Sequence, residues 1–296
     1  MTLRIAYVVK TSSLEAFAKR KAGARIEHLL SVGDPTVSRV RATHEAHTKT
    51  VEEVFRAFDS IGADAVAIGP RTKDLTRAKF DLVVTVGGDG TLLRASHRVS
   101  DVPILGINSA PLTSVGFFCG AQGGGVLHAI ERAIDGRLRS RTLARMTVTL
   151  GKRVVSSRVL NDALFCHQSP AATSRYLIEL GRTKEEHKSS GFWIGPAAGS
   201  TAAQRSAGGK VLPLDSQALQ FVMREPYTPM GERYELRRVL VEERKALVVR
   251  SKMHESALFL DGPDDVTKVS FGDVLRFSLS DEPLQLLGIA SRSKRG

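Results

Sequence analysis

Residues 81–92 read Asp-Leu-Val-Val-Thr-Val-Gly-Gly-Asp-Gly-Thr-Leu. The run from Asp81 to Val86 is apolar and rich in β-branched residues, as is typical of a strand covered on both faces of a parallel sheet. The periodicity of Leu92–Val99 predicts a helix, so the glycines lie in the turn between a buried strand and a helix. This order of elements favours a parallel α/β architecture.

The neighbouring segments continue the alternation. Ile5–Val9, residues 65–68 and Val102–Ile107 have strand composition, and the apolar side chains of residues 51–61 fall on one helical face. Residues 1–119 therefore predict an α/β domain with a Rossmann-like parallel sheet.

The pattern changes after residue 120. Three glycines at 123–125 and a short helix over Val126–Ile134 are followed by short strands separated by turn signals. We expect an all-β domain, a β-sandwich, over residues 120–280, and a C-terminal tail over 281–296 that could return to the first domain. The expected strands are Met146–Leu150, Tyr176–Leu180, Phe192–Ile194, Leu219–Arg224, Ala257–Leu260 and Val274–Leu279.

Composition limits the classes of protein. Of 296 residues, 42% are hydrophobic and 25% are charged, which excludes disorder and coiled coil, and no apolar run approaches the roughly 20 residues of a membrane span. Two cysteines, Cys119 and Cys166, without a CxxC pair suit a reducing cytoplasm, so we expect a cytoplasmic location. The net charge of +12 favours polyanionic partners, but a solvated arginine-rich surface explains it equally well.

The glycine turn carries the strongest chemical signal. Glycines allow backbone N–H groups to approach a phosphate chain, and the following helix start favours negative charge. Asp89, held among those amides, could bind a metal or accept a proton from an attacking hydroxyl, as phosphoryl transfer requires. The alternative is a tight turn in which Asp89 caps the helix.

Two histidines, His44 and His47, are three residues apart near an expected helix start. No other residues with zinc-ligand spacing accompany them, so we expect solvated helix-end histidines.

Several ordered motifs resemble those of the NAD kinase family. Gly87–Ala95 is similar to its signature, and Gly106–Ser109 to the end of its next strand. The pair Asn161-Asp162, the segment Gly199–Gly209 and the dipeptide Asp261-Gly262 resemble its later motifs. The resemblance implies the fold shared by NAD kinases and diacylglycerol kinases.

It also implies a reaction, in which ATP phosphorylates the adenosine 2′-hydroxyl of NAD+ or NADH with Mg2+ or another divalent cation. By this resemblance Asp89 is the general base, and the backbone of Gly87 and Gly88 lies against the ATP phosphates. Homo-oligomers, dimers or tetramers, are typical of the family, and neither membrane nor nucleic acid is an expected partner. The remaining residues that the resemblance places in the binding site are Gly90, Thr91, Arg94, Asn161, Asp162, Lys188, Ser200, Thr201, Ala202 and Ser206; none is assigned to a metal.

This sequence departs from the family at four positions: Ser190 replaces the usual Asp, Pro196 a Thr, Ala203 a Tyr and Gln204 a Ser. Together with the surrounding segments, these departures resemble the plant-type NADH kinase branch. If position 190 lies near the nicotinamide, loss of its carboxylate removes a contact for the positively charged ring of NAD+. A preference for NADH of about 5- to 150-fold would follow.

Alternatives stay open from the residues alone. Asn161-Asp162 could form an Asx turn, and Lys188 could be a solvated lysine. At the level of function, the alternatives are a lipid or sphingoid kinase of the same superfamily and a non-catalytic basic nucleotide-binding protein.

Overall fold

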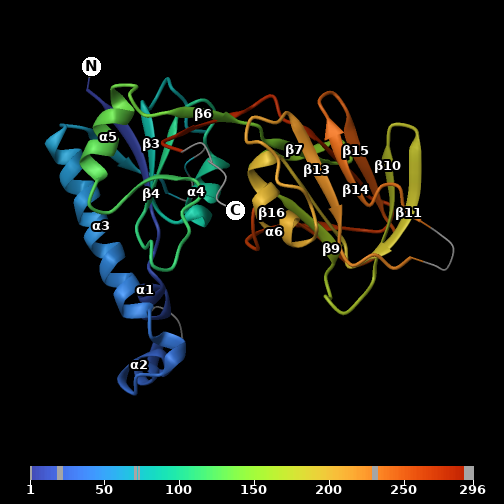
Figure 1. Cartoon of the computed structure of the whole chain (residues 1–296), viewed down its shortest axis with the longest axis horizontal. Coiled ribbons are helices and arrows are strands. Elements are labelled where there is room, and N and C mark those ends of the chain that lie inside the picture. The colour runs from blue at the N-terminus through green and yellow to red at the C-terminus, as the bar shows by residue number, and fades with distance from the viewer. Residues whose placement is uncertain (1, 19–22, 70–71, 73, 229–232, 290–296) are drawn as a thin grey trace. The chain divides into compact units, whose positions relative to one another are not determined.

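The computed structural model describes residues 2–18, 23–69, 72, 74–228 and 233–289. The chain forms two compact units (Figure 1). The first contains residues up to Arg141 together with those from Gln285 onward, and the second is Thr142–Leu284. The first is an α/β unit with a parallel sheet and the second is antiparallel and all-β, which confirms the expected fold class.

The first unit is built on a parallel sheet. Among the described residues this sheet has seven strands: β1 (Arg4–Val9), β2 (Asp64–Ala67), β3 (Leu82–Gly87), β4 (Ile104–Asn108), β5 (Cys119–Gln122), β6 (Ser140–Leu143) and β19 (Leu284–Leu287). Their order is β2-β1-β3-β4-β19-β6, with β5 also pairing with β4. Strands β1, β3 and β4 pair in parallel, and every residue of β3 and β4 is buried. The apolar run of residues 82–86 thus forms a central strand.

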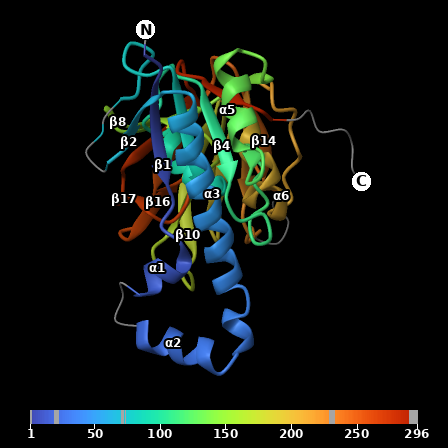
Figure 2. The same ribbon diagram turned by 90° about the vertical axis from the view of Figure 1, so that its left-hand side faces the viewer.

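Helices cover this sheet on its faces and at one end. They are α1 (Ser13–Ala18), α2 (Gly23–Ser31), α3 (Val40–Ser60), α4 (Asp89–Ser96) and α5 (Val126–Ile134), with a 3-10 turn η1 (Pro35–Val37). Helices α3 and α5 contact each other, and Val54, Phe58 and Ile130 pack with sheet residues in one core. Figure 2 shows α3 crossing the sheet, with α1 and α2 beyond its end. Helix α4 contacts β3 and begins at Asp89, directly after the glycine turn.

The expected boundary between residues 119 and 120 differs from the observed division. Strand β5 pairs with β4 and helix α5 packs on α3, so both elements belong to the first unit. The glycines at 123–125 separate a strand from a helix, and Gly125 caps α5. Residues from Gln285 belong to the first unit, where β19 pairs in parallel with β4. Residues 290–296 of the expected tail lie outside the described residues.

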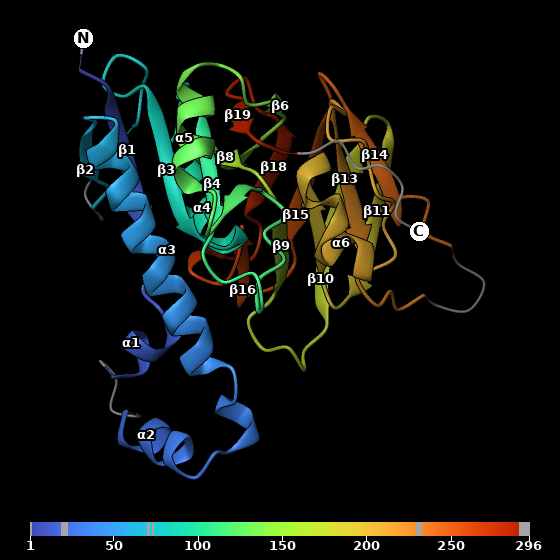
Figure 3. The same ribbon diagram turned by 60° about the vertical axis from the view of Figure 1, so that its left-hand side comes forward.

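The second unit contains two antiparallel sheets, each with six strands among the described residues (Figure 3). One has the order β11-β10-β15-β18-β7-β8 and the other β14-β13-β12-β9-β16-β17. The first sheet contains β7 (Met146–Leu150), β8 (Arg153–Val159), β10 (Ser174–Leu180), β11 (Thr183–Ser189), β15 (Ala246–Ser251) and β18 (Val274–Leu279). The second contains β9 (Ala163–His167), β12 (Phe192–Gly195), β13 (Ala218–Met223), β14 (Arg238–Glu242), β16 (Ser256–Leu260) and β17 (Asp265–Val269).

The two sheets share one hydrophobic core. Phe192 of the second sheet packs against Tyr176 and Phe277 of the first, with ring centroids 5.2 and 5.8 Å apart. Buried residues alternate with exposed ones along β10, as in a strand with one face in a core. A core shared by two facing sheets is the defining feature of a β-sandwich.

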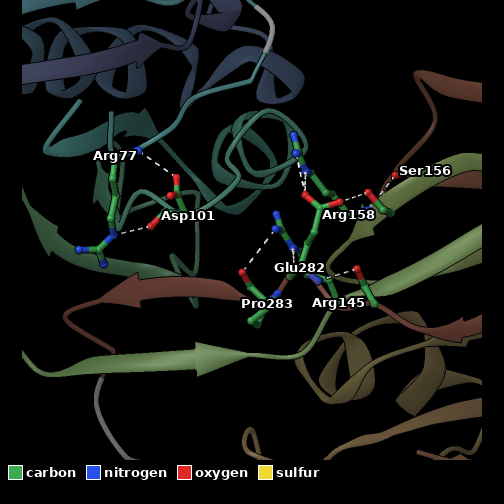
Figure 4. A network of polar contacts seen from close by, with 9 residues as sticks. Arg77, Asp101, Arg145, Ser156, Arg158, Glu282 and Pro283 are labelled. Atoms are coloured by element: carbon green, nitrogen blue, oxygen red, sulfur yellow. Dashed lines mark hydrogen bonds and ion pairs between the residues drawn. The ribbon is translucent and has the colours of Figure 1, made fainter. Parts of the chain in front are cut away.

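A polar network holds the segment that leads to β19 (Figure 4). Arg145 is fully buried, and its guanidinium donates to the backbone carbonyls of Glu282 and Pro283. The Glu282 carboxylate accepts hydrogen bonds from Ser157 at 2.5 Å and from Arg158 at 2.7 Å. These contacts fix Glu282 and Pro283 to β8 and to Arg145, the residue directly before β7, within the second unit.

Candidate active site

The turn between β3 and α4 is packed so closely that side chains do not fit at its first two positions. A Cβ atom on Gly87 would lie 2.3 Å from the hydroxyl oxygen of Thr91, and one on Gly88 would lie 2.3 Å from that of Ser114. Nothing lies within 4 Å of the corresponding position on Gly90. The Thr91 hydroxyl is buried and has no hydrogen-bond partner among the described residues. The side chains of Thr91 and Ser114 therefore fill the inside of the turn, against the backbone of Gly87 and Gly88.

Asp89 is the first residue of α4 and is half-buried. One carboxylate oxygen accepts a hydrogen bond from the backbone N–H of Phe117 at 2.9 Å, and the other accepts from that of Phe118 at 2.8 Å. The expectation that the glycine amides hold this carboxylate is therefore wrong, because residues after β4 supply the donors. Each carboxylate oxygen keeps a further lone pair that can accept a proton.

The loop that follows β4 is fixed onto this turn. The Asn108 side chain donates to the carbonyl of Ser114 at 3.0 Å and accepts from the N–H of Ala110 at 3.3 Å. Asn108 and Asp89 thus hold residues 110–118 at two points. Leu112 and Val115 lie at the exposed part of the loop, 71% and 91% exposed. The sequence indicated Asn108 through its motif but gave no sign of the role of the Phe117 and Phe118 amides.

Arg94, the other residue of α4 expected in the site, is exposed and lies in the last turn of that helix. It is five residues from Asp89, so the two side chains leave the helix in different directions.

In the second unit, the pair Asn161-Asp162 lies in the turn between β8 and β9. The Asp261 carboxylate accepts hydrogen bonds from the backbone N–H groups of Leu160, Asn161 and Asp162 at 2.8, 2.7 and 3.0 Å. In return, the Asp261 N–H donates to the carbonyl of Asp162 at 2.9 Å. Asp261 therefore fixes the backbone of the pair, a role that its Asp-Gly motif alone did not reveal.

The side chains of the pair also contact each other. The Asn161 amide donates to the Asp162 carboxylate at 3.0 Å, and Asp162 is only 5% exposed. Burial, followed by the nearby charge of Asp261, raises the pKa of Asp162 to about 7. Near neutral pH this carboxyl group can therefore either donate or accept a hydrogen bond.

The second glycine-rich segment packs directly on Asn161. It forms a 3-10 helix η2 (Ala197–Thr201) and a short helix α6 (Ala203–Ser206). A Cβ atom on Gly199 would lie 1.6 Å from the carbonyl oxygen of Asn161. The Gln204 side chain is buried and donates to the same carbonyl at 3.4 Å. The fold thus brings together two segments that lie about 40 residues apart in the sequence.

The four candidate residues of this segment differ in exposure. The Ser200 hydroxyl is fully buried, donates to the carbonyl of Ala197 and accepts from the N–H of Leu212, so it braces the segment internally. Thr201 and Ala202 are half-buried, and Ser206 is exposed. These three can contact a ligand where they stand.

Neither cysteine has the lowered pKa of a nucleophilic thiol. Burial, followed by the charge of Asp89, raises the pKa of the Cys119 thiol to about 12, and burial also raises the pKa of Cys166. The described part of the chain contains no group of three or more His, Cys, Asp or Glu residues that could hold a metal ion. None of its helices is long and apolar enough to cross a membrane.

Comparison with known proteins identifies the family. A protein of Oryza sativa subsp. japonica named "Probable NADH kinase" is 36% identical over 226 residues, which cover 69% of this chain and 69% of that protein. The chain belongs to the NAD kinase family. Residues 37–133 match the family model described as the ATP-NAD kinase N-terminal domain. An Arabidopsis thaliana protein named "NADH kinase" is 34% identical over 242 residues, or 69% of this chain and 71% of that protein.

Solved structures share the fold of this NAD kinase family member. An Archaeoglobus fulgidus NAD kinase in complex with ATP has a TM-score of 0.69 at 18% identity, covering 97% of this chain and 94% of that one. The yeast NADH kinase complexed with NADH has a TM-score of 0.66 at 18% identity, covering 98% and 84%. At such identities the likeness shows the fold.

The structure also shows what surrounds the unusual Ser190. The Arg224 guanidinium donates to the Ser190 carbonyl at 3.3 Å and lies over the ring of Trp193, 5.9 Å from its centroid. The Ser190 N–H in turn donates to the carbonyl of Arg224 at 3.2 Å. Lys188 is half-buried on β11, opposite Arg175 of β10. The Arg224 guanidinium therefore lies beside the backbone of Ser190, the position at which the resemblance implies an aspartate.

The other three departures also have structural roles. Pro196 precedes the first residue of η2 and Ala203 begins α6. Gln204 replaces the small family serine with a buried amide, whose oxygen accepts from Gln220 at 3.1 Å.

Proposed function

We propose that this protein transfers the γ-phosphate of ATP to the 2′-hydroxyl of the adenosine ribose of NAD(H), giving NADP(H). The observation that carries the proposal is Asp89, a carboxylate fixed at the carboxyl end of β3 directly after Gly87 and Gly88, where an added Cβ would meet Thr91 and Ser114. Its relatives named NADH kinase and NAD kinase support the same reaction.

In this proposal Asp89 is the general base. Two backbone N–H groups orient its carboxylate, while the free lone pairs accept the proton of the ribose hydroxyl as that oxygen attacks the terminal phosphorus. The backbone of Gly87 and Gly88 receives the phosphates of ATP, Gly90 and Arg94 contribute to the dinucleotide site, and the buried Thr91 supports the turn from within.

The residues of the second unit hold the dinucleotide. Asn161 supplies an amide and Asp162 a carboxyl group, and both can bond to neighbouring hydroxyls of a ribose. Because the pKa of Asp162 is raised to about 7, its carboxyl group can accept a hydrogen bond from a ribose hydroxyl when ionised and donate one to it when protonated. Lys188, Thr201, Ala202 and Ser206 are the remaining contacts of this proposal, and Ser200 supports them from within.

A divalent cation belongs to the substrate in this scheme. Both oxygens of Asp89 already accept backbone hydrogen bonds, and the donor set around the turn does not make a metal site by itself. We therefore treat MgATP as the phosphoryl donor. The magnesium ion would neutralise charge on the phosphates, while the chain's own residues bind and orient the reactants.

Ser190 and Arg224 support a preference for NADH. The positive ring of NAD+ would meet the Arg224 guanidinium where the family usually supplies an opposite charge, whereas the ring of NADH is neutral. Such a charge contact changes the preference by about 5- to 150-fold. Measuring kcat/KM for both dinucleotides tests this, and a clear preference for NAD+ would refute it.

The reaction itself is tested with purified protein, MgATP and NADH, by chromatographic detection of NADPH, since NADH and NADPH absorb alike. Reactions without ATP and with NAD+ in place of NADH serve as controls. Absence of a phosphorylated product from either dinucleotide would overturn the proposal. The homo-oligomeric state and the cytoplasmic location stay predictions, to be tested by light scattering and cell fractionation.

A further inference from the structure

His47 lies in the interior of α3 and is only 6% exposed. The expectation of a solvated histidine at a helix end is therefore wrong for this residue, because the helix begins at Val40 and turns position 47 inward. His44, one turn earlier, is half-buried, and its Nδ1 atom bonds to the Ser12 hydroxyl at 2.8 Å.

The His47 ring joins the ends of two strands. Its Nδ1 atom lies 2.8 Å from the Ser109 hydroxyl oxygen, directly after β4. The backbone of Lys10, directly after β1, lies close to the ring: burial lowers the pKa of His47, and this backbone raises it by a smaller amount. The His47 side chain therefore reaches Lys10 and Ser109, which follow β1 and β4, the two strands that flank β3.

These same two residues hold the end of β3. The Lys10 N–H donates to the carbonyl of Val86 at 2.9 Å, and the Ser109 N–H donates to the carbonyl of Gly87 at 3.0 Å. A Cβ atom on Gly87 would lie 3.1 Å from Cβ of Lys10, so the two backbones are close neighbours. Movement of Lys10 or Ser109 would therefore displace Gly87 directly.

Charged groups around the ring are few and of mixed sign. Burial is the main cause that lowers the pKa of His47, and the titratable groups that face it are Glu15 of α1, Lys10 after β1 and His44 of α3. A neutral imidazole has one donor and one acceptor nitrogen, so the ring can bond to the Ser109 hydroxyl through Nδ1 and still offer Nε2 to a second partner.

We propose that His47 is a positioning residue, which holds the ends of β1 and β4 at a fixed spacing around Gly87 and thereby shapes the backbone that receives the ATP phosphates. The inference rests on the proposed function for its consequence in catalysis. Small displacements of positioned groups reduce rates by up to about 100-fold.

The test compares four single variants of the full chain and the double variant His47→Leu/Ser109→Ala. His47→Leu removes the hydrogen bond to Ser109 and the polar ring beside Lys10, His47→Asn keeps a polar atom near the place of Nδ1, and Ser109→Ala removes the hydroxyl partner. His128→Gln is the matched control, because His128 is exposed on α5. We expect His47→Leu to lower kcat/KM for ATP by about 5- to 150-fold, with KM for NADH within twofold of wild type.

Further results separate positioning from general support of the fold. We expect His47→Asn to recover part of the loss and the effects of His47→Leu and Ser109→Ala to be non-additive, because the two residues share one hydrogen bond. Equal changes in KM for both substrates, or kcat/KM for ATP within twofold of wild type per folded molecule, would overturn the inference. If His47→Leu does not fold, His47→Asn and Ser109→Ala decide the question. A wild-type protein that makes no NADPH would instead refute the proposed function.

Discussion

Asp89→Asn is the substitution whose consequences the structure defines most sharply. Asparagine offers one acceptor oxygen where aspartate offers two, so its NH2 group would face the N–H of either Phe117 or Phe118. One unpaired backbone donor costs about 1–3 kcal/mol, which we expect as a loss of loop stability. Loss of the general base reduces the rate by roughly 10²–10⁴-fold, or about 3–5 kcal/mol in the barrier.

A second variant separates these two effects. Asn108→Ala removes two hydrogen bonds from the same loop, to Ser114 and Ala110, and leaves the Asp89 carboxylate in place. We expect Asp89→Asn to lower kcat by at least about 100-fold and Asn108→Ala by less than about 10-fold. The assay is steady-state formation of NADPH, with the folded fraction of each variant measured by denaturation.

The general-base assignment fails under either of two results. Asp89→Asn could retain kcat within tenfold of wild type, in which case the carboxylate takes no proton in the slow step. Alternatively, Asn108→Ala could lose as much activity as Asp89→Asn, in which case the position of the loop explains both losses.

Three other outcomes follow from the second unit and its packing. The pKa of Asp162 is raised from 3.8 to about 7, so its protonated form stabilises the fold at low pH and that stability, at most ~4 kcal/mol, is lost as pH rises from about 4 to about 7. Asp162→Asn should flatten the dependence of unfolding free energy on pH between about pH 5 and pH 7, and an unchanged slope would contradict this. Gly199→Ala should lower Tm and NADH affinity because its Cβ would meet the Asn161 carbonyl, whereas Gly69→Ala, with 4.0 Å to its nearest neighbour, should match wild type in both. Arg145→Met should cost about 1–3 kcal/mol of unfolding free energy, since the carbonyls of Glu282 and Pro283 lose their donor. A change below about 1 kcal/mol in urea denaturation would show that solvent replaces the guanidinium (Figure 4).

Much of the fold could be predicted from local sequence. The expected bounds of α5, β7 and β18 agree with the structure, because each is an apolar stretch delimited by glycine or by polar residues. Helices α1 and α2 were not expected; both are short, and neither has a buried residue. The domain boundary was placed too early because a run of glycines marks a turn within a unit as readily as a linker between units.

The site could be predicted only where its residues are neighbours in sequence. The glycine turn and the pair Asn161-Asp162 are compact motifs. The partners that orient them are distant, since Phe117 lies 28 residues from Asp89 and Asp261 lies 100 residues from Asn161. Backbone donors such as the Phe117 N–H have no signature in the residue type. The burial of His47 likewise could not be predicted, because it depends on where α3 begins, and no capping side chain marks that start in the sequence.

Incubation of the purified protein with MgATP and NADH tests the proposed reaction most directly. We expect NADPH phosphorylated at the adenosine 2′-position, formed only in the presence of ATP and slower by at least about 100-fold with Asp89→Asn. Folded protein that binds ATP and NADH but leaves both unchanged would contradict it.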